Sequence, residues 1–141
     1  MKKTDIQFKF QNQRMKSINF KVNEKFTLKQ EYEAVPSFLF SYSSNRKKKI
    51  LVVELGIRFS STKAPCSLEV ISEGVFIFKE MPKVSALEEI SCTKCNPMIF
   101  PFLRETIADL TRRAGIPPLL LPPVNFVDFY KSFKKEQSKA T

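Results

Sequence analysis

Residues 50–60 read ILVVELGIRFS and carry the clearest secondary-structure pattern in the chain. Apolar side chains occupy every second position, and they are Leu51, Val53, Leu55, Ile57 and Phe59. A period of two predicts a half-buried β-strand, which we expect over about residues 50–62. The fold therefore contains a sheet with one face against a core.

Similar alternation on both sides extends the sheet. It predicts further strands over about residues 5–22, 36–44 and 67–79. The first is either one long kinked strand or two short ones, and Glu73-Gly74 suggests a bulge in the last. Short polar links predict an antiparallel meander of three strands from 36 to 79. The longer connection 23–36 joins the first strand to this meander in a Greek-key pattern.

The period changes to that of helices in the last third of the chain, which predicts helices over about 97–114 and 126–136. Asn96 is a candidate cap with Pro97 at the first helical position, and Gly115 is a natural stop. Residues 119–123, LLLPP, predict an extended strap, after which Asn125 caps the second helix. We expect one α+β domain over residues 1–141, in which a four-stranded antiparallel Greek-key sheet precedes two helices.

Composition excludes most enzyme classes. The 141 residues contain no histidine and only three glycines, so His-based catalysis and Gly-rich phosphate loops are absent from the sequence. We therefore predict a protein that is not an enzyme and has no cofactor. No apolar run resembles a signal peptide or a membrane span, and three cysteines fit reduced thiols, so we expect a cytoplasmic protein without membrane insertion.

Charge and cysteine spacing leave two weaker alternatives. The net charge of +10 and the run Arg46-Lys47-Lys48-Lys49 suggest a nucleic-acid-binding protein, but the run lacks interleaved aromatic residues, which favours a solvated loop. Cys92 and Cys95 form a CxxC spacing. Four zinc ligands cannot be assembled from three cysteines without histidine in one chain, so we favour structural cysteines over a metal site.

Two motifs in the helical part resemble the SecB family of export chaperones. Residues 96–105, NPMIFPFLRE, follow Cys95 as the family's turn and first helix do, and residues 118–126, PLLLPPVNF, resemble the family's strap. Agreement is looser upstream, at 15–21 and 68–76, but the resemblance covers nearly the whole chain. It implies a homotetramer, built as a dimer of dimers, that binds unfolded clients in apolar grooves. The implied role is either protein export or, as in toxin–antitoxin-associated members, that of a dedicated chaperone for an antitoxin.

The resemblance also points to site residues. Fourteen phenylalanines exceed what a small core needs, and apolar residues in the aperiodic connection suggest exposed binding surface. The predicted client-binding residues are Phe26, Leu28, Val35, Phe38, Phe40, Phe126, Phe129, Tyr130 and Phe133. Aromatic faces of helices are more often core, and only the family resemblance favours binding for the outer residues of the last helix.

The predicted partner surface departs from the family pattern. Classical members dock on the SecA motor through acidic sheet residues, and here Glu69 is acidic whereas Ser17 and Lys21 occupy positions that are acidic in the family. Lysines also replace the acidic tail. We therefore expect weak or absent SecA docking, with an antitoxin as the alternative partner.

Overall fold

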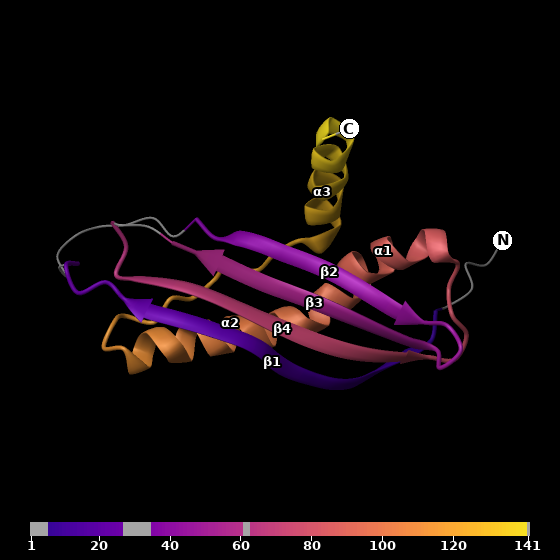
Figure 1. The fold of residues 1–141 in the computed structure, drawn as a ribbon, viewed down its shortest axis with the longest axis horizontal. Coiled ribbons are helices and arrows are strands. Elements are labelled where there is room, and N and C mark those ends of the chain that lie inside the picture. Colours follow the sequence, from indigo (N-terminus) through magenta and orange to yellow (C-terminus); the bar gives the residue numbers. More distant parts are fainter. Residues whose placement is uncertain (1–5, 27–34, 61–62, 141) are drawn as a thin grey trace.

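The chain forms one four-stranded antiparallel sheet with helix against one face (Figure 1). The fold is given by a computed structural model that describes residues 6–26, 35–60 and 63–140. The strands are β1 (Phe8–Val22), β2 (Ser37–Asn45), β3 (Ile50–Phe59) and β4 (Cys66–Phe78). Their order is β1-β4-β3-β2, so β1 returns beside β4 after the β2–β4 meander. The predicted α+β Greek-key fold is confirmed.

Strand β1 is a single strand with two irregularities. Its pairing with β4 shifts between Phe10 and Asn12 and again between Met15 and Ser17, which leaves Gln11 and Lys16 as extra residues. These bulges bend the strand. The bulge expected at Glu73-Gly74 is wrong, because β4 runs regularly there and both shifts lie on β1.

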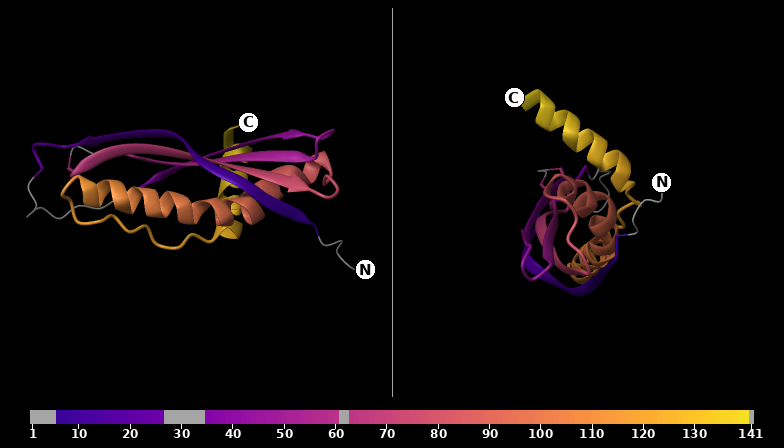
Figure 2. Two further views of the ribbon diagram at one scale, coloured as in Figure 1. Left: turned by 90° about the horizontal axis from the view of Figure 1, so that it is seen from below. Right: turned by 90° about the vertical axis from the view of Figure 1, so that its right-hand side faces the viewer.

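Gly74 has a packing role instead. A Cβ atom at this position would lie 2.9 Å from Ile99 Cδ1 and 3.0 Å from Phe76 Cε1. The absence of a side chain therefore lets helix α2 (Asn96–Arg113) approach the sheet closely. The helix runs along one face of the sheet (Figure 2), where its side chains Ile99, Leu103 and Ile107 are fully buried.

The helical segment begins earlier than predicted. A 3-10 turn η1 (Val84–Ala86) leads into α1 (Leu87–Ile90), a π-helical turn η2 (Ser91–Cys95) and then α2 without interruption. The helix expected over about 97–114 matches α2, but the predicted cap is wrong, because Asn96 has helical dihedral angles and is fully buried. Pro97 lacks an N–H and its ring crowds the preceding turn, so the wider π turn accommodates it inside the helix.

Helix α2 ends at Arg113, and Gly115 just beyond it adopts a left-handed φ of 74°, which is the predicted stop. The strap from 116 to 125 then runs back along the helix. The hydroxyl of Thr111 accepts the Leu119 N–H at 2.9 Å, and Arg104 Nε donates to the Leu121 carbonyl at 2.7 Å. These two contacts fix the extended strap against α2.

Helix α3 (Phe126–Ala140) begins after a side-chain cap. Asn125 Oδ1 accepts the N–H groups of Val127 at 3.0 Å and Asp128 at 3.2 Å, which is the predicted cap. The helix stands out from the body of the molecule (Figures 1 and 2). Within the described residues, no helix combines the length and the apolar character needed to cross a membrane.

Candidate functional site

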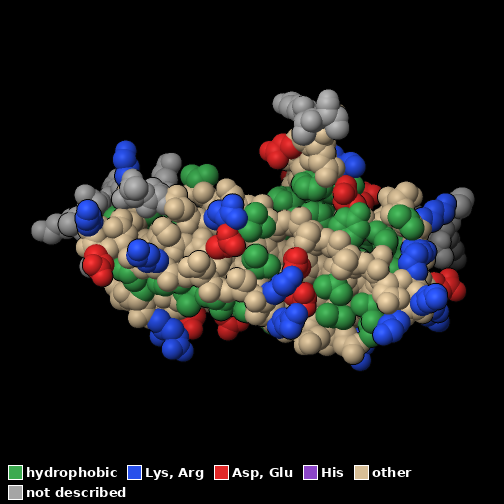
Figure 3. Space-filling model, viewed as in Figure 1, with side chains coloured by type: hydrophobic (Ala, Val, Ile, Leu, Met, Phe, Trp, Pro, Cys, Tyr) green, Lys and Arg blue, Asp and Glu red, His purple; other side chains and the backbone are tan. Residues whose placement is uncertain are grey.

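Aromatic side chains gather where strand β2 meets helix α3. Phe38 lies 5.4 Å from Phe129 and Phe40 lies 5.5 Å from Phe133, measured between ring centroids, and both pairs are edge-on. We call the half-buried or exposed rings of this region the aromatic surface, and its members are Phe38, Phe40, Tyr42, Phe129, Tyr130 and Phe133. Figure 3 shows hydrophobic side chains gathered at the base of α3.

Two periodicities build this surface. Phe38, Phe40 and Tyr42 alternate along β2 and point to the helical side of the sheet, opposite the buried Ile57, Leu55 and Val53 of β3. On α3, residues 126, 129, 130 and 133 recur at three- and four-residue spacing, so they share one helix face. Strand β2 is an edge strand, so its inward rings extend past the core.

The aromatic surface rests on two buried rings. Phe126 is 4% exposed and Phe100 is 6% exposed. Phe126 lies 5.7 Å from both Phe100 and Phe129, and Phe38 lies 6.5 Å from Phe126. Edge-to-face contacts of this kind add about 0.5–1.5 kcal/mol per pair beyond area burial. The base of α3 is therefore held by the core, while its later turns carry more exposed rings.

A polar contact joins α3 to α1 at the rim. Glu88 Oε1 accepts from Lys134 Nζ at 3.3 Å and from the Tyr130 hydroxyl at 3.4 Å. Burial, followed by the charge of Glu88, raises the pKa of Tyr130 above its ordinary value. Lys134 Nζ also lies 5.9 Å from the centre of the Tyr130 ring. This contact links the middle turns of α3 to α1.

The structure brings six of the nine predicted client-binding residues together. Phe126 belongs to the core and supports the others, which are Phe38, Phe40, Phe129, Tyr130 and Phe133. Phe26 lies beyond the end of β1, where its N–H donates to the Asn23 carbonyl at 3.1 Å. Val35 precedes β2 and is 75% exposed. Leu28 lies outside the described residues.

Sequence reasoning missed Tyr42 and Phe100. Tyr42 continues the alternation of Phe38 and Phe40 and stacks on Phe40 at 6.1 Å, so the period-two signal was sufficient to include it. Phe100 lies 6.4 Å from Phe38. Its role could not be read locally, because it depends on how α2 lies against the β2 edge.

The predicted partner residues share the outer face of the sheet. Ser17 and Lys21 of β1 pair with Ile71 and Ser67 of β4, so they point to the same side as Glu69. Glu69 accepts a hydrogen bond from Arg58 Nε at 2.7 Å.

The other two carboxylates of this face are also paired. Glu73 accepts from Arg14 Nε at 2.9 Å. Glu54 accepts from Lys16 and from the Ser41 hydroxyl. Hydrogen bonding from Lys16 lowers the pKa of Glu54 despite the opposing effect of burial. Glu54, Glu69 and Glu73, the carboxylates that the described strands place on this face, are thus each engaged by a basic side chain of the same chain.

The two cysteines of the CxxC spacing are fully buried in the helical segment. Burial raises the pKa of Cys92 to about 11 and that of Cys95 to about 12. Both thiols are therefore protonated at neutral pH, which makes them poor nucleophiles for thiol exchange. In the part of the chain that the structure describes, no group of three or more His, Cys, Asp or Glu side chains is placed to hold a metal ion.

Comparison with known proteins identifies relatives along most of the chain. The sequence profile described as "Preprotein translocase subunit SecB" matches residues 2–137. A "Protein-export protein SecB" of Methylobacillus flagellatus is 44% identical over 73 residues, which are 52% of this chain and 46% of the relative. One of Afipia carboxidovorans is 36% identical over 90 residues, which are 64% and 55% of the two chains. The matches thus span about half the length of these curated relatives.

A solved structure shares the fold at low sequence identity. It is the SecB-like chaperone of Mycobacterium tuberculosis in complex with a ChAD peptide from the HigA1 antitoxin. The TM-score is 0.75 at 17% identity, over 83% of this chain and 90% of the other. A protein of unknown function from Streptococcus agalactiae has a TM-score of 0.53 at 10% identity, over 85% of this chain and 100% of the other.

Proposed function

Because the chain belongs to the SecB family, we propose that it is a molecular chaperone that holds unfolded or extended polypeptides on the aromatic surface. The observation that carries the proposal is the row of half-buried rings between β2 and α3, which lie outside the fully buried core. Its action is binding without bond chemistry, in keeping with a sequence that contains no histidine. We propose that the protein performs this function in the cytoplasm.

The chemistry of the surface fits weakly specific binding. Apolar burial is worth about 25 cal/mol per Å² and has no direction, so many client sequences gain from it. Phenylalanine offers a large rigid area with few rotatable bonds, which lowers the entropy cost of binding. The net charge of +10 favours client segments that carry acidic residues.

Substitution of Phe133 by Ser tests the proposal. Phe133 is half-buried and its ring contacts are with Phe40 and Tyr130, away from the buried rings at the base of α3. Half of a phenylalanine burial is about 1 kcal/mol, so we expect roughly a fivefold weaker Kd for an unfolded client. The measurements are suppression of client aggregation and binding of a fluorescently labelled, permanently unfolded protein.

The matched control is Val127→Ser on the same helix. Val127 is 51% exposed, and its residue position lies off the aromatic face of α3. This variant should protect clients like the wild type, and both variants should melt within a few degrees of it. Normal protection by Phe133→Ser, with Val127→Ser equally active, would place the client site elsewhere.

We further propose that the protein is a homotetramer, assembled as a dimer of dimers. Several large apolar side chains remain exposed outside the client site, among them Ile18 at 49% on β1, and Met98 and Phe102 at 39% each on α2. Such exposure outside the client site favours burial between subunits. Analytical ultracentrifugation at micromolar concentration tests this, and a stable monomer contradicts it.

We propose that docking to SecA is weak or absent. The carboxylates Glu54, Glu69 and Glu73 are occupied by Lys16, Arg58 and Arg14, so a basic partner would have to displace intramolecular ion pairs. Titration against purified SecA checks this for the wild type and for a Ser17→Glu, Lys21→Glu double variant. The double variant should bind more tightly. Tight, salt-sensitive binding of the wild type contradicts the proposal.

A dedicated antitoxin chaperone is the second candidate function. It is favoured by the shared fold with a SecB-like chaperone that was solved with an antitoxin peptide. The two roles are distinguished by identifying and quantifying the polypeptides that co-purify with the wild-type protein and with the Phe133→Ser variant. One dominant client supports a dedicated chaperone, and a broad mixture supports a general one.

A further inference from the structure

Two segments far apart in sequence meet at one end of the sheet and concentrate basic side chains there. They are the β2–β3 hairpin turn and the connection from β4 to η1. Arg46 Nη1 donates to the Pro82 carbonyl at 2.9 Å, and Lys49 Nζ donates to the Lys79 carbonyl at 3.0 Å. We call this region the basic end, and its cations are Arg46, Lys47, Lys48, Lys49, Lys79 and Lys83.

The charges of the basic end are not neutralised within the described residues. The ion pairs of the described residues lie outside the basic end. The cations that they engage are Arg14, Lys16, Arg58, Arg112, Arg113 and Lys134. Arg46 and Lys49 use backbone carbonyls, which orient the cations without cancelling their charge. The nearby acidic side chain is Glu80, which lines the same depression as Lys79 and Lys83. Six basic side chains and Glu80 therefore leave a local excess of positive charge at this end among the described residues.

Backbone strain at Lys49 indicates that the hairpin is not optimised for folding alone. Lys49 has φ of 58°, a conformation that favours Gly or Asn in a hairpin turn. The protein carries lysine there, and its side chain reaches the β4–η1 connection. Strain retained at an exposed charged tip is typical of functional surfaces.

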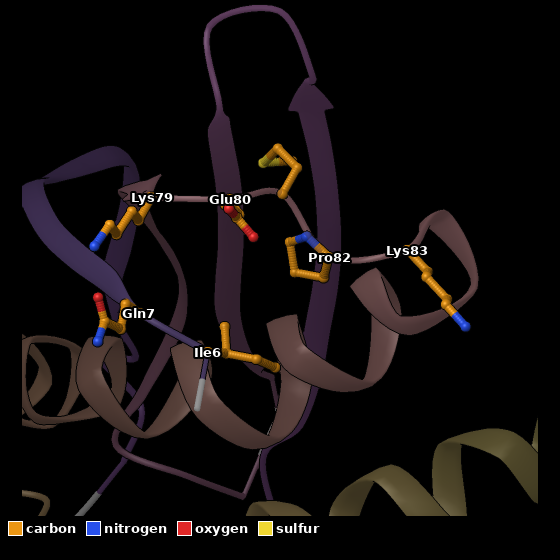
Figure 4. A pocket seen from close by; sticks show the side chains of 7 residues that line it. Ile6, Gln7, Lys79, Glu80, Pro82 and Lys83 are labelled. Carbon is orange, nitrogen blue, oxygen red and sulfur yellow. The ribbon is translucent and has the colours of Figure 1, made fainter. Parts of the chain in front are cut away.

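Apolar side chains accompany the cations. Val84, next to Lys83, is 68% exposed, and Ile6 is 43% exposed. Ile6, Met81 and Pro82 line an open depression of about 540 Å³ with Lys79 and Lys83. Figure 4 shows Ile6 and Pro82 between these two lysines.

We propose that the basic end docks the protein on an anionic lipid bilayer. Clustered Lys and Arg beside exposed aliphatic side chains fit a membrane interface, where charge attracts headgroups and aliphatic groups enter the acyl boundary. Binding of single-stranded nucleic acid instead relies on aromatic rings free to stack on bases. The rings at this end, Phe8 and Phe78, pack against each other at 5.2 Å, and Phe78 is buried.

Vesicle co-sedimentation of the full chain tests this docking. The probes are phosphatidylcholine vesicles with and without about one third phosphatidylglycerol. We expect binding to the anionic vesicles only, with release at high salt. Each basic residue near an anionic surface contributes about fivefold to partitioning, so a Lys47→Gln, Lys48→Gln variant should bind roughly 25-fold more weakly. Val84→Ser should weaken the vesicle binding that remains at intermediate salt concentration, because it removes an apolar contact that salt does not screen.

The matched control is Lys21→Gln, Lys25→Gln, which removes the same charge at the opposite end of β1, where both line another depression. We expect it to change partitioning by less than about threefold, with all variants melting like the wild type. Equal losses in the two double variants would show a general charge effect and overturn the proposal. Binding of a polyuridylate RNA with no vesicle binding would also overturn it.

Discussion

Replacement of Gly74 by Ala probes the contact that places α2 on the sheet. The new Cβ would meet Ile99 Cδ1 at 2.9 Å and Ile99 Cγ1 at 3.0 Å, in a region where Ile99 and Phe76 are fully buried. Overpacking of this kind costs about 1–3 kcal/mol. Alanine also lowers the conformational entropy of the unfolded chain, which stabilises the folded state by about 0.4–1 kcal/mol. The net expectation is destabilisation by about 1–2 kcal/mol.

The magnitude converts to a measurable change in melting temperature. Unfolding entropy is about 2.1 cal/mol/K per residue, or roughly 0.3 kcal/mol/K for a chain of this length. The Gly74→Ala variant should therefore melt about 3–7 °C below the wild type at equal protein concentration. Circular dichroism measures the transition. The concentration must be matched, because any oligomer adds a mass-action contribution to stability.

A second substitution isolates the steric cause. Ile99→Val removes the Cδ1 atom that would lie nearest to the new Cβ, and alone it should cost about 0.5–1.5 kcal/mol. In the Gly74→Ala background it should cost much less or raise the melting temperature, which gives a coupling free energy near 1 kcal/mol. Additive effects of the two substitutions, or a Gly74→Ala variant as stable as the wild type, would refute the close-packing argument.

Three further changes test other parts of the structure. Iodoacetamide should label Cys92 and Cys95 very slowly in the native protein at pH 8, because burial raises their pKa values to about 11 and 12, and rapidly after unfolding in urea. Asn125→Ala should cost about 1 kcal/mol and speed amide hydrogen exchange in the first turn of α3, since it removes the acceptor for two N–H groups. The folded-state pKa of Glu54 is lowered from 4.5, so its contribution is present at neutral pH and fades as pH falls through the folded value. Urea denaturation at pH 7 and pH 3 should therefore show a slightly smaller stability difference for Glu54→Gln than for the wild type, and an identical difference would contradict this linkage.

Patterns that depend on near neighbours could be predicted from the sequence. The alternation around Leu55 identified β3, and the sequence around Gly115 and Asn125 identified one helix end and one helix start. These signals are local, because they reflect dihedral preference, capping and the period of the pleat. The strand order followed from link lengths, since short polar links join antiparallel neighbours.

Features that depend on tertiary packing could not be predicted in the same way. Asn96-Pro97 has the local signature of a helix start, but burial of Leu87 and Ile90 extends the helix through it by a π turn. Gly74 suggested a bulge, although its reason is the approach of Ile99 from a segment of the chain that follows much later. Of the predicted site residues, Phe126 proved to be core because three other rings enclose it.

The two bulges of β1 also bear on how the length of this strand can vary. Phe10 and Met15 share the helical side of the sheet with Ile18, although their spacing in sequence breaks a strict alternation. Removal of Gln11 or Lys16 would join correctly paired neighbours and leave every other side chain on its present side. Removal of a residue from a regularly paired part of the strand, such as Gln13, would instead turn a neighbouring side chain over. Chain-length differences among homologous strands should therefore occur at these two positions, and an alignment that preserves simple alternation will misplace them.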